Sequence, residues 1–110
     1  MATVSVPGGC NGPIGSGNGG YTAGLLASLV GEPASVSLRS PVPLDRDLAA
    51  IVDGDRVRVL DGEALVAEGE SESDFALEVP GAVTVEAARA AMLEYAGRTD
   101  GPFSTCFVCG

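Results

Sequence analysis

Residues 21–30 form a stretch with almost no polar side chains, since only Thr22 and Ser28 interrupt its run of apolar and small residues. Asn18 before it is a suitable N-cap, and Gly31 after it is a typical helix end. The pattern therefore predicts a helix from about Gly19 to Val30. Because a helix that is apolar on all sides must be buried on all sides, we expect the rest of the chain to wrap around it.

Two runs that follow, residues 35–40 and 56–60, alternate between polar and apolar residues, as is typical of half-buried strands. Residues 48–52 and 64–67 are short apolar runs that we also expect to be strands. Asp53-Gly54 and Asp61-Gly62 separate the last three runs, and Asp-Gly between such runs is a strong hairpin signal. We expect an antiparallel meander, with residues 74–79 as a weaker candidate extension. Pro41 and Pro43 limit the first strand.

A second helix is expected at residues 85–96, with Thr84 as its N-cap and Gly97 as its end. Four of its apolar residues fall on one face at helical spacing, namely Val85, Ala88, Met92 and Tyr95. This amphipathic pattern indicates a helix that packs on an outer surface. The predicted fold is α+β: a curved antiparallel sheet around one buried central helix, with a second, C-terminal helix.

Charge and composition narrow the range of partners and compartments. The 110 residues carry a formal net charge of −9, which disfavours nucleic acid and anionic membrane surfaces. No run approaches the roughly 20 apolar residues of a membrane span. The N-terminus has no basic region before an apolar run, so no secretory signal is visible. Three cysteines, an odd number, do not suggest a disulfide framework, and a reducing cytoplasm fits best.

Two sequence patterns bear on ligand binding: a glycine-rich segment and a pair of cysteines. Residues 8–20 contain seven glycines, and Gly15, Gly17 and Gly20 have the spacing G-x-G-x-x-G. No strong strand precedes this segment and no lysine follows it as a P-loop would need, so we exclude nucleotide binding. Cys106 and Cys109 form a Cys-x-x-Cys pair. With only Cys10 in addition and no histidine, a four-ligand zinc site is short of a ligand. We interpret the pair as semi-buried strand residues, with a redox or zinc site as the alternative. We expect no cofactor.

Three segments of the chain resemble hotdog-fold thioesterases. The segment 18–27, Asn-Gly-Gly-Tyr-Thr-Ala-Gly-Leu-Leu-Ala, resembles their His-Gly-Gly helix start. The segments 37–44 and 61–68 resemble the strand after the helix and a late strand. Together they fall within residues 10–70, and their order and spacing match the family.

The C-terminal segment 105–110 resembles the start of another hotdog unit. The whole chain is therefore similar to the N-terminal half of actinobacterial double-hotdog acyl-CoA thioesterase-like proteins. The resemblance implies a hotdog module at residues 1–80, followed at 81–110 by a helix and the beginning of a second unit.

The resemblance also implies a site at the start of the first helix. Gly19 and Gly20 would direct free backbone N–H groups at a thioester carbonyl, with Asn18 beside them as a third catalytic candidate. Substrate-binding candidates lining an acyl tunnel are Tyr21, Leu25 and Leu26. The alternative is that the two glycines only permit a tight turn into the helix.

The chain departs from the family at the positions that would activate water. Ala27 and Ser28 stand where related thioesterases often carry an acid, Asn18 stands in place of histidine, and the chain has no histidine. Glu32 is close but beyond the helix. A second unit is expected to supply the carboxylate. Glu63 or Glu68 could reach a site across a dimer, although both are interpreted as surface residues.

These observations favour an acyl-CoA hydrolase-like hotdog protein, catalytically degenerate in this half. The alternative function is a non-enzymatic acyl-binding or assembly module. Short strands leave open sheet edges, so we expect a homodimer or a second hotdog domain as partner.

Overall fold

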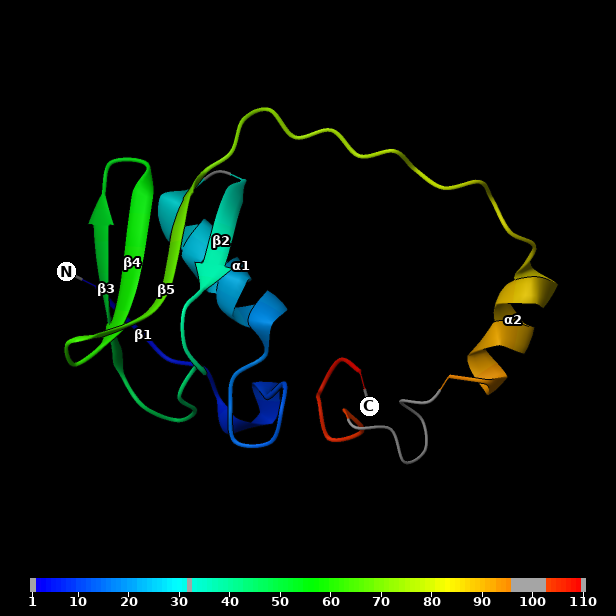
Figure 1. The fold of residues 1–110 in the computed structure, drawn as a ribbon, viewed down its shortest axis with the longest axis horizontal. Helices are drawn as coiled ribbons and strands as arrows, with labels where there is room; N and C mark the ends of the chain where they lie inside the picture. Colours follow the sequence, from blue (N-terminus) through cyan, green and yellow to red (C-terminus); the bar gives the residue numbers. More distant parts are fainter. Residues whose placement is uncertain (1, 32, 96–102, 110) are drawn as a thin grey trace.

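The structure is a computed structural model that describes residues 2–31, 33–95 and 103–109. The elements, in chain order, are β1 (Ala2–Val4), the 3-10 helix η1 (Gly8–Cys10), α1 (Gly19–Val30), β2 (Ala34–Leu38), β3 (Leu48–Asp53), β4 (Arg56–Asp61), β5 (Ala64–Ser71) and α2 (Val85–Leu93). The strands form a five-stranded antiparallel sheet in the order β1-β3-β4-β5-β2 (Figure 1). The predicted α+β class and the predicted bounds of α1 are confirmed.

The meander from β3 to β5 is joined by two hairpins, as predicted. Each aspartate of the two Asp-Gly pairs is the last residue of its strand and faces the first residue of the next, in the pairs Asp53–Arg56 and Asp61–Ala64. Gly54 and Gly62 then open two-residue loops, both with φ of 62°. A glycine with positive φ at the first loop position fits a type II′ turn, whose twist matches that of the strands.

β5 is longer than predicted and β1 was not predicted, and both differences are explained by their neighbours in the sheet. β5 runs on to Ser71, since it lies between β4 and β2 and has a partner on both sides. β1 has only three residues and no recognisable pattern of its own, but it forms by pairing with β3. Residues 74–79 are exposed and form no strand, so the predicted extension of the sheet there was wrong.

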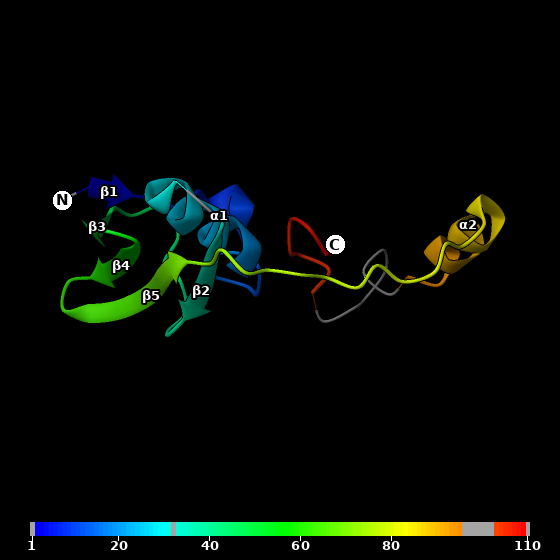
Figure 2. The same cartoon turned by 90° about the horizontal axis from the view of Figure 1, so that it is seen from above.

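The core lies between α1 and the inner face of the sheet. Seen from above in Figure 2, the strands follow a curve and α1 lies on its inner side. A register shift between Val59 and Leu60, where β4 meets β5, adds local bending. The buried core consists of Val6, Leu26, Val42, Leu48, Ala50, Val57, Val59, Val66 and Ala67. It contains no aromatic residue, which fits the low aromatic content of the sequence.

Helix α1 is not buried on all sides, which corrects the prediction from its apolar composition. Thr22 and Leu26 are fully buried against the sheet, whereas Gly20, Gly24 and Ser28 are exposed on the opposite face. Glycine and serine carry little apolar surface, so leaving this face in water costs little. The bounds of the helix were therefore predicted correctly, but its outward face is exposed to solvent.

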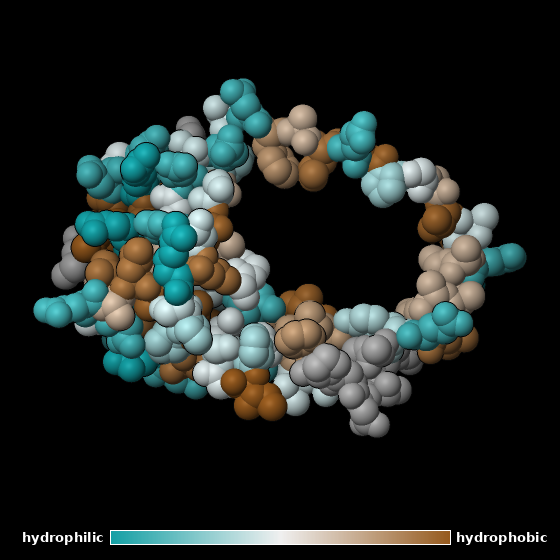
Figure 3. Space-filling model, in the orientation of Figure 1, coloured by the Kyte–Doolittle hydropathy of each residue, from teal (hydrophilic) through white to brown (hydrophobic). Residues whose placement is uncertain are grey.

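Helix α2 does not pack on the sheet, which corrects a second prediction. Its N-cap is as predicted, since the Thr84 hydroxyl oxygen accepts a hydrogen bond from the Ala87 N–H at 3.1 Å. All residues of α2 are exposed, because residues 72–84 run extended away from β5 (Figure 1). Residues 72–84 and α2 together form a C-terminal arm, and Figure 3 shows apolar side chains scattered along it. The helix ends at Leu93, with Glu94 as its C-cap, so the predicted extent to Ala96 was too long. Gly97 lies outside the described residues.

The arm makes the molecule longer than an ordinary domain of its size. The radius of gyration is 16.6 Å, whereas a compact chain of this length is expected to have about 13 Å. The alanine-rich sequence of α2 and its Thr84 cap favour helix formation locally.

Replacing Gly24 by alanine is expected to raise the free energy of unfolding by about 0.5–1 kcal/mol. Gly24 is exposed within α1, and nothing lies within 4 Å of the position that a Cβ would take. Alanine therefore gains helix propensity at no steric cost. Urea denaturation followed by circular dichroism measures the change, and a destabilised variant would show that this face of α1 is covered.

Candidate functional site

The start of α1 is fixed by Asn18. This residue has extended backbone angles, φ −64° and ψ 133°, and its side-chain oxygen accepts a hydrogen bond from the Tyr21 N–H at 3.0 Å. Its backbone carbonyl accepts from both the N–H and the hydroxyl of Thr22, at 3.0 and 2.8 Å. The predicted N-cap is therefore confirmed, and the Asn18 side-chain oxygen is committed to capping.

The glycine-rich loop before α1 is tied down by backbone hydrogen bonds. The Gly17 N–H donates to the Val42 carbonyl at 2.8 Å, and the Asn18 N–H donates to the Cys10 carbonyl at 2.9 Å. An isolated bridge pairs Asn11 with Gly17. These contacts hold the first turn of α1 in place relative to the core.

Gly19 and Gly20 occupy the first two positions of α1. Within the described part of the chain, neither N–H has a hydrogen-bond acceptor. Gly19 is half-buried and Gly20 is exposed. Free N–H groups at a helix start carry a partial positive charge, so an electron-rich oxygen would be stabilised there.

A hollow of about 360 Å³ opens beside Gly19. Its lining is Pro13, Ser16, Gly17, Gly19, Leu38, Arg39, Ser40, Pro41 and Val42. The Leu38 side chain lies close to Gly19, because a Cβ on that glycine would be 3.1 Å from Leu38 Cδ1. The lining includes one cation, Arg39, and no carboxylate. Such a hollow can hold an acyl or thioester group but brings no general base of its own.

The three predicted substrate-binding residues differ in their surroundings. Tyr21 is half-buried and packs edge-to-face against Phe107, with ring centroids 6.2 Å apart. Leu25 is half-buried against the core, and Leu26 is fully buried inside it. None of the three lines the hollow beside Gly19. Their role in binding an acyl chain stays a prediction.

The candidate carboxylates lie apart from the start of α1. Glu63 is exposed in the turn between β4 and β5. Glu68 accepts hydrogen bonds from the Arg39 guanidinium at 2.9 and 2.5 Å on the outer face of the sheet. Ser28, at one of the positions where the sequence resemblance implies an acid, donates its hydroxyl hydrogen to the Leu25 carbonyl at 2.7 Å. Glu32 lies outside the described residues.

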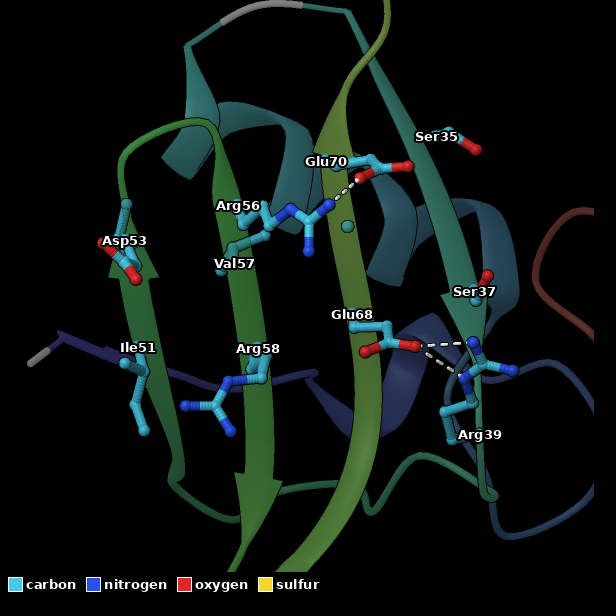
Figure 4. A pocket seen from close by; sticks show the side chains of 12 residues that line it. Ser35, Ser37, Arg39, Ile51, Asp53, Arg56, Val57, Arg58, Glu68 and Glu70 are labelled. Atoms are coloured by element: carbon cyan, nitrogen blue, oxygen red, sulfur yellow. Dashed lines mark hydrogen bonds and ion pairs between the residues drawn. The ribbon is translucent and has the colours of Figure 1, made fainter.

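A larger hollow, of about 700 Å³, lies on the outer face of the sheet (Figure 4). Four of the six charged side chains that line it form cross-strand ion pairs, Arg39 with Glu68 and Arg56 with Glu70 at 3.1 Å. Asp53 and Arg58, which also line it, form no ion pair with the described residues. Exposed pairs of this kind contribute little to stability, and they largely neutralise one another. Asn18, Gly19 and Gly20 are not part of this face, so we do not assign the site to the larger hollow.

The C-terminal segment meets the helix start. The Asn11 side-chain amide donates to the Thr105 carbonyl at 2.7 Å, and the Phe107 N–H donates to the Asn11 carbonyl at 3.2 Å. The Asn18 amide nitrogen lies 3.5 Å from the Cys106 sulfur and donates to it. Residues 103–109 form turns, so the interpretation of the two cysteines as strand residues was wrong.

Cys106 is the residue at this site that the sequence interpretation missed. Its side chain is buried, at 4% exposure, and its sulfur also accepts the Cys109 N–H at 3.4 Å. The N–H groups of Cys109 and then Val108 lower the pKa of the Cys106 thiol. The interaction with Cys106 raises the pKa of the Cys109 thiol. The Cys-x-x-Cys spacing was the available signal, but the contact with Asn18 depends on the fold.

Across residues 2–31, 33–95 and 103–109, no three potential metal ligands among cysteine, aspartate and glutamate side chains come together. No described helix has the length and apolar character needed to cross a bilayer. Comparison of the chain with protein-family models, curated proteins and solved structures gave no match.

Proposed function

We propose that this chain is a hotdog-type unit that handles acyl thioesters at the start of α1. The observation that carries the proposal is the pair of unpartnered N–H groups of Gly19 and Gly20, of which Gly19 lines an open hollow. The position of α1, after a short first strand and before the four remaining strands, is compatible with the order of elements that the sequence resemblance implies.

The proposed role of this chain is binding and polarisation of the thioester carbonyl. Two N–H groups directed at the carbonyl oxygen would stabilise the negative charge that develops on it during attack by water. Because the lining has no carboxylate, hydrolysis would need a base from a second unit.

The required experiment measures binding and turnover of the same esters. Acyl-CoA esters of increasing chain length are titrated into the full chain by calorimetry, and release of free CoA is followed by chromatography. Binding with hydrolysis supports a complete hydrolase. Binding without hydrolysis supports the acyl-binding module, and absence of both rejects the proposal.

Replacing Gly19 by proline is expected to weaken acyl-CoA binding about fivefold relative to alanine at the same position, because a lost hydrogen bond costs about 1 kcal/mol. Proline removes the N–H but suits the first position of a helix, and the extended Asn18 before it is compatible with proline. Gly19→Ala is the matched control, since it places a similar Cβ beside Leu38 and keeps the N–H. Equal affinities of the two variants would contradict the proposed N–H contact.

A second copy of the chain or a second hotdog domain is the proposed partner. β1 and β2 are the outer strands of the sheet and leave backbone groups available for pairing. Light scattering of the purified chain tests self-association: a dimer at micromolar concentration supports a homodimer. A monomer that also fails to bind a separately expressed hotdog unit would reject this part of the proposal.

A further inference from the structure

The Cys-x-x-Cys pair in the C-terminal segment has chemistry of its own that does not depend on acyl binding. We propose that Cys106 and Cys109 form a reversible dithiol–disulfide pair that exchanges with small-molecule disulfides. Both thiols are reduced in the structure. The third cysteine, Cys10, contributes its backbone carbonyl to the loop before α1, where it accepts the Asn18 N–H.

The two cysteines are already held together. The Cys109 N–H donates to the Cys106 sulfur at 3.4 Å, across a segment of turns. A disulfide needs α-carbons within about 7 Å of each other, and a chain that folds back over three residues can bring them within that range. The Cys106 N–H donates to the Phe103 carbonyl at 3.0 Å, which adds a further turn just before the pair.

The surroundings of Cys106 favour a thiolate. Its sulfur accepts hydrogen bonds from the Cys109 N–H and from the Asn18 amide, and such donors stabilise negative charge on sulfur. They lower the pKa of Cys106, with the backbone N–H of Cys109 as the largest cause. No charged side chain is among the groups that shift this pKa. Nearby, the Tyr95 hydroxyl donates to the Cys109 carbonyl.

The exchange proceeds in two balanced steps. The Cys106 thiolate attacks one sulfur of the small disulfide RSSR, the S–S bond breaks, and RS⁻ leaves to take a proton from water. Cys109 then loses its proton to solvent and attacks the Cys106 sulfur of the mixed disulfide, which expels a second RS⁻. In total the protein is oxidised by two electrons and RSSR is reduced to two RSH.

Access to Cys106 requires the tail to lift from the helix start. At 4% exposure, Cys106 is shielded, whereas Cys109 is half-exposed. The hydrogen bonds between the described tail and the body involve Asn11 and Asn18, and Phe107 packs on Tyr21. Segments held by so few contacts open readily, so we expect exchange without global unfolding.

The test equilibrates the full chain with glutathione and glutathione disulfide in varied ratios, followed by acid quenching, alkylation and mass spectrometry. The expected product has lost two hydrogens and carries a disulfide between Cys106 and Cys109. Cys10→Ala is expected to give the same product at the same ratio. Cys109→Ala is expected to stop at a mixed disulfide on Cys106. Disulfides that involve Cys10, or mixed disulfides alone on the unmodified chain, would overturn the proposal.

Asn18→Asp tests the contact on which Cys106 depends. Aspartate caps a helix as well as asparagine does, but it replaces the N–H donor near the sulfur by a carboxylate. The pKa of Cys106 should rise, and its alkylation by iodoacetamide at neutral pH should slow about threefold, since the lost thiolate outweighs the gain in nucleophilicity. Ser28→Asp, at the other end of α1, is the charge-matched control. An unchanged pH profile in Asn18→Asp would exclude the Asn18–Cys106 contact.

Discussion

Replacing Leu26 by alanine is expected to lower the free energy of unfolding by about 3 kcal/mol. Leu26 is 0% exposed and is the large α1 side chain that the sheet buries completely. Its neighbours in the core are mainly valine and alanine, which are short and branched or lack rotamers, so they cannot move to fill the space. The loss should therefore include a cavity cost in addition to the lost apolar burial.

Urea denaturation measures this change, and Leu77→Ala is the matched control. Leu77 lies in the extended arm and is 75% exposed, so its truncation should leave the unfolding midpoint unchanged. Equal stabilities of the two variants would mean that α1 is not packed on the sheet. The assignment of a core between helix and sheet would then be wrong.

Replacing Gly17 by alanine is expected to lower the free energy of unfolding by about 2 kcal/mol. A Cβ at this position would lie 3.0 Å from Val42 Cβ and 3.2 Å from Val6 Cγ1. Both valines are buried, and the hydrogen bond from the Gly17 N–H to the Val42 carbonyl holds the two backbones together. Neither the Gly17 backbone nor the two valine side chains can move apart without disrupting core packing. The added methyl group would therefore overpack this region.

Gly9→Ala separates this steric effect from the general effect of replacing a loop glycine, since nothing lies within 4 Å of its added Cβ. It should be neutral or slightly stabilising. Combining Gly17→Ala with Val42→Ala should cost less than the sum of the two single changes, because the second removes Val42 Cγ1, which would lie 3.1 Å from the added Cβ. Strict additivity would show that Gly17 and Val42 are not in contact.

The sequence alone determined those parts of the molecule that depend on local chemistry. The bounds of α1 follow from Asn18, which satisfies a free N–H, and from Gly31, which adopts a φ of 82° at the helix end. The two hairpins follow from Gly54 and Gly62, and the Thr84 cap from its hydroxyl group. In each case, a single residue type satisfies a backbone requirement within a few positions of itself, so the signal is visible in the printed sequence.

Only the tertiary structure decided how these elements are exposed and which distant residues meet. Apolar composition predicted a helix buried on all sides, but burial depends on which face the sheet covers, and α1 turns Gly20, Gly24 and Ser28 outward. The amphipathic pattern of α2 does not determine whether the chain brings this helix against the sheet. Likewise, the contact of Asn18 with Cys106 joins residues 88 positions apart. Hydrophobic periodicity indicates the secondary structure that a segment favours. Which other segments it contacts depends on the path of the whole chain.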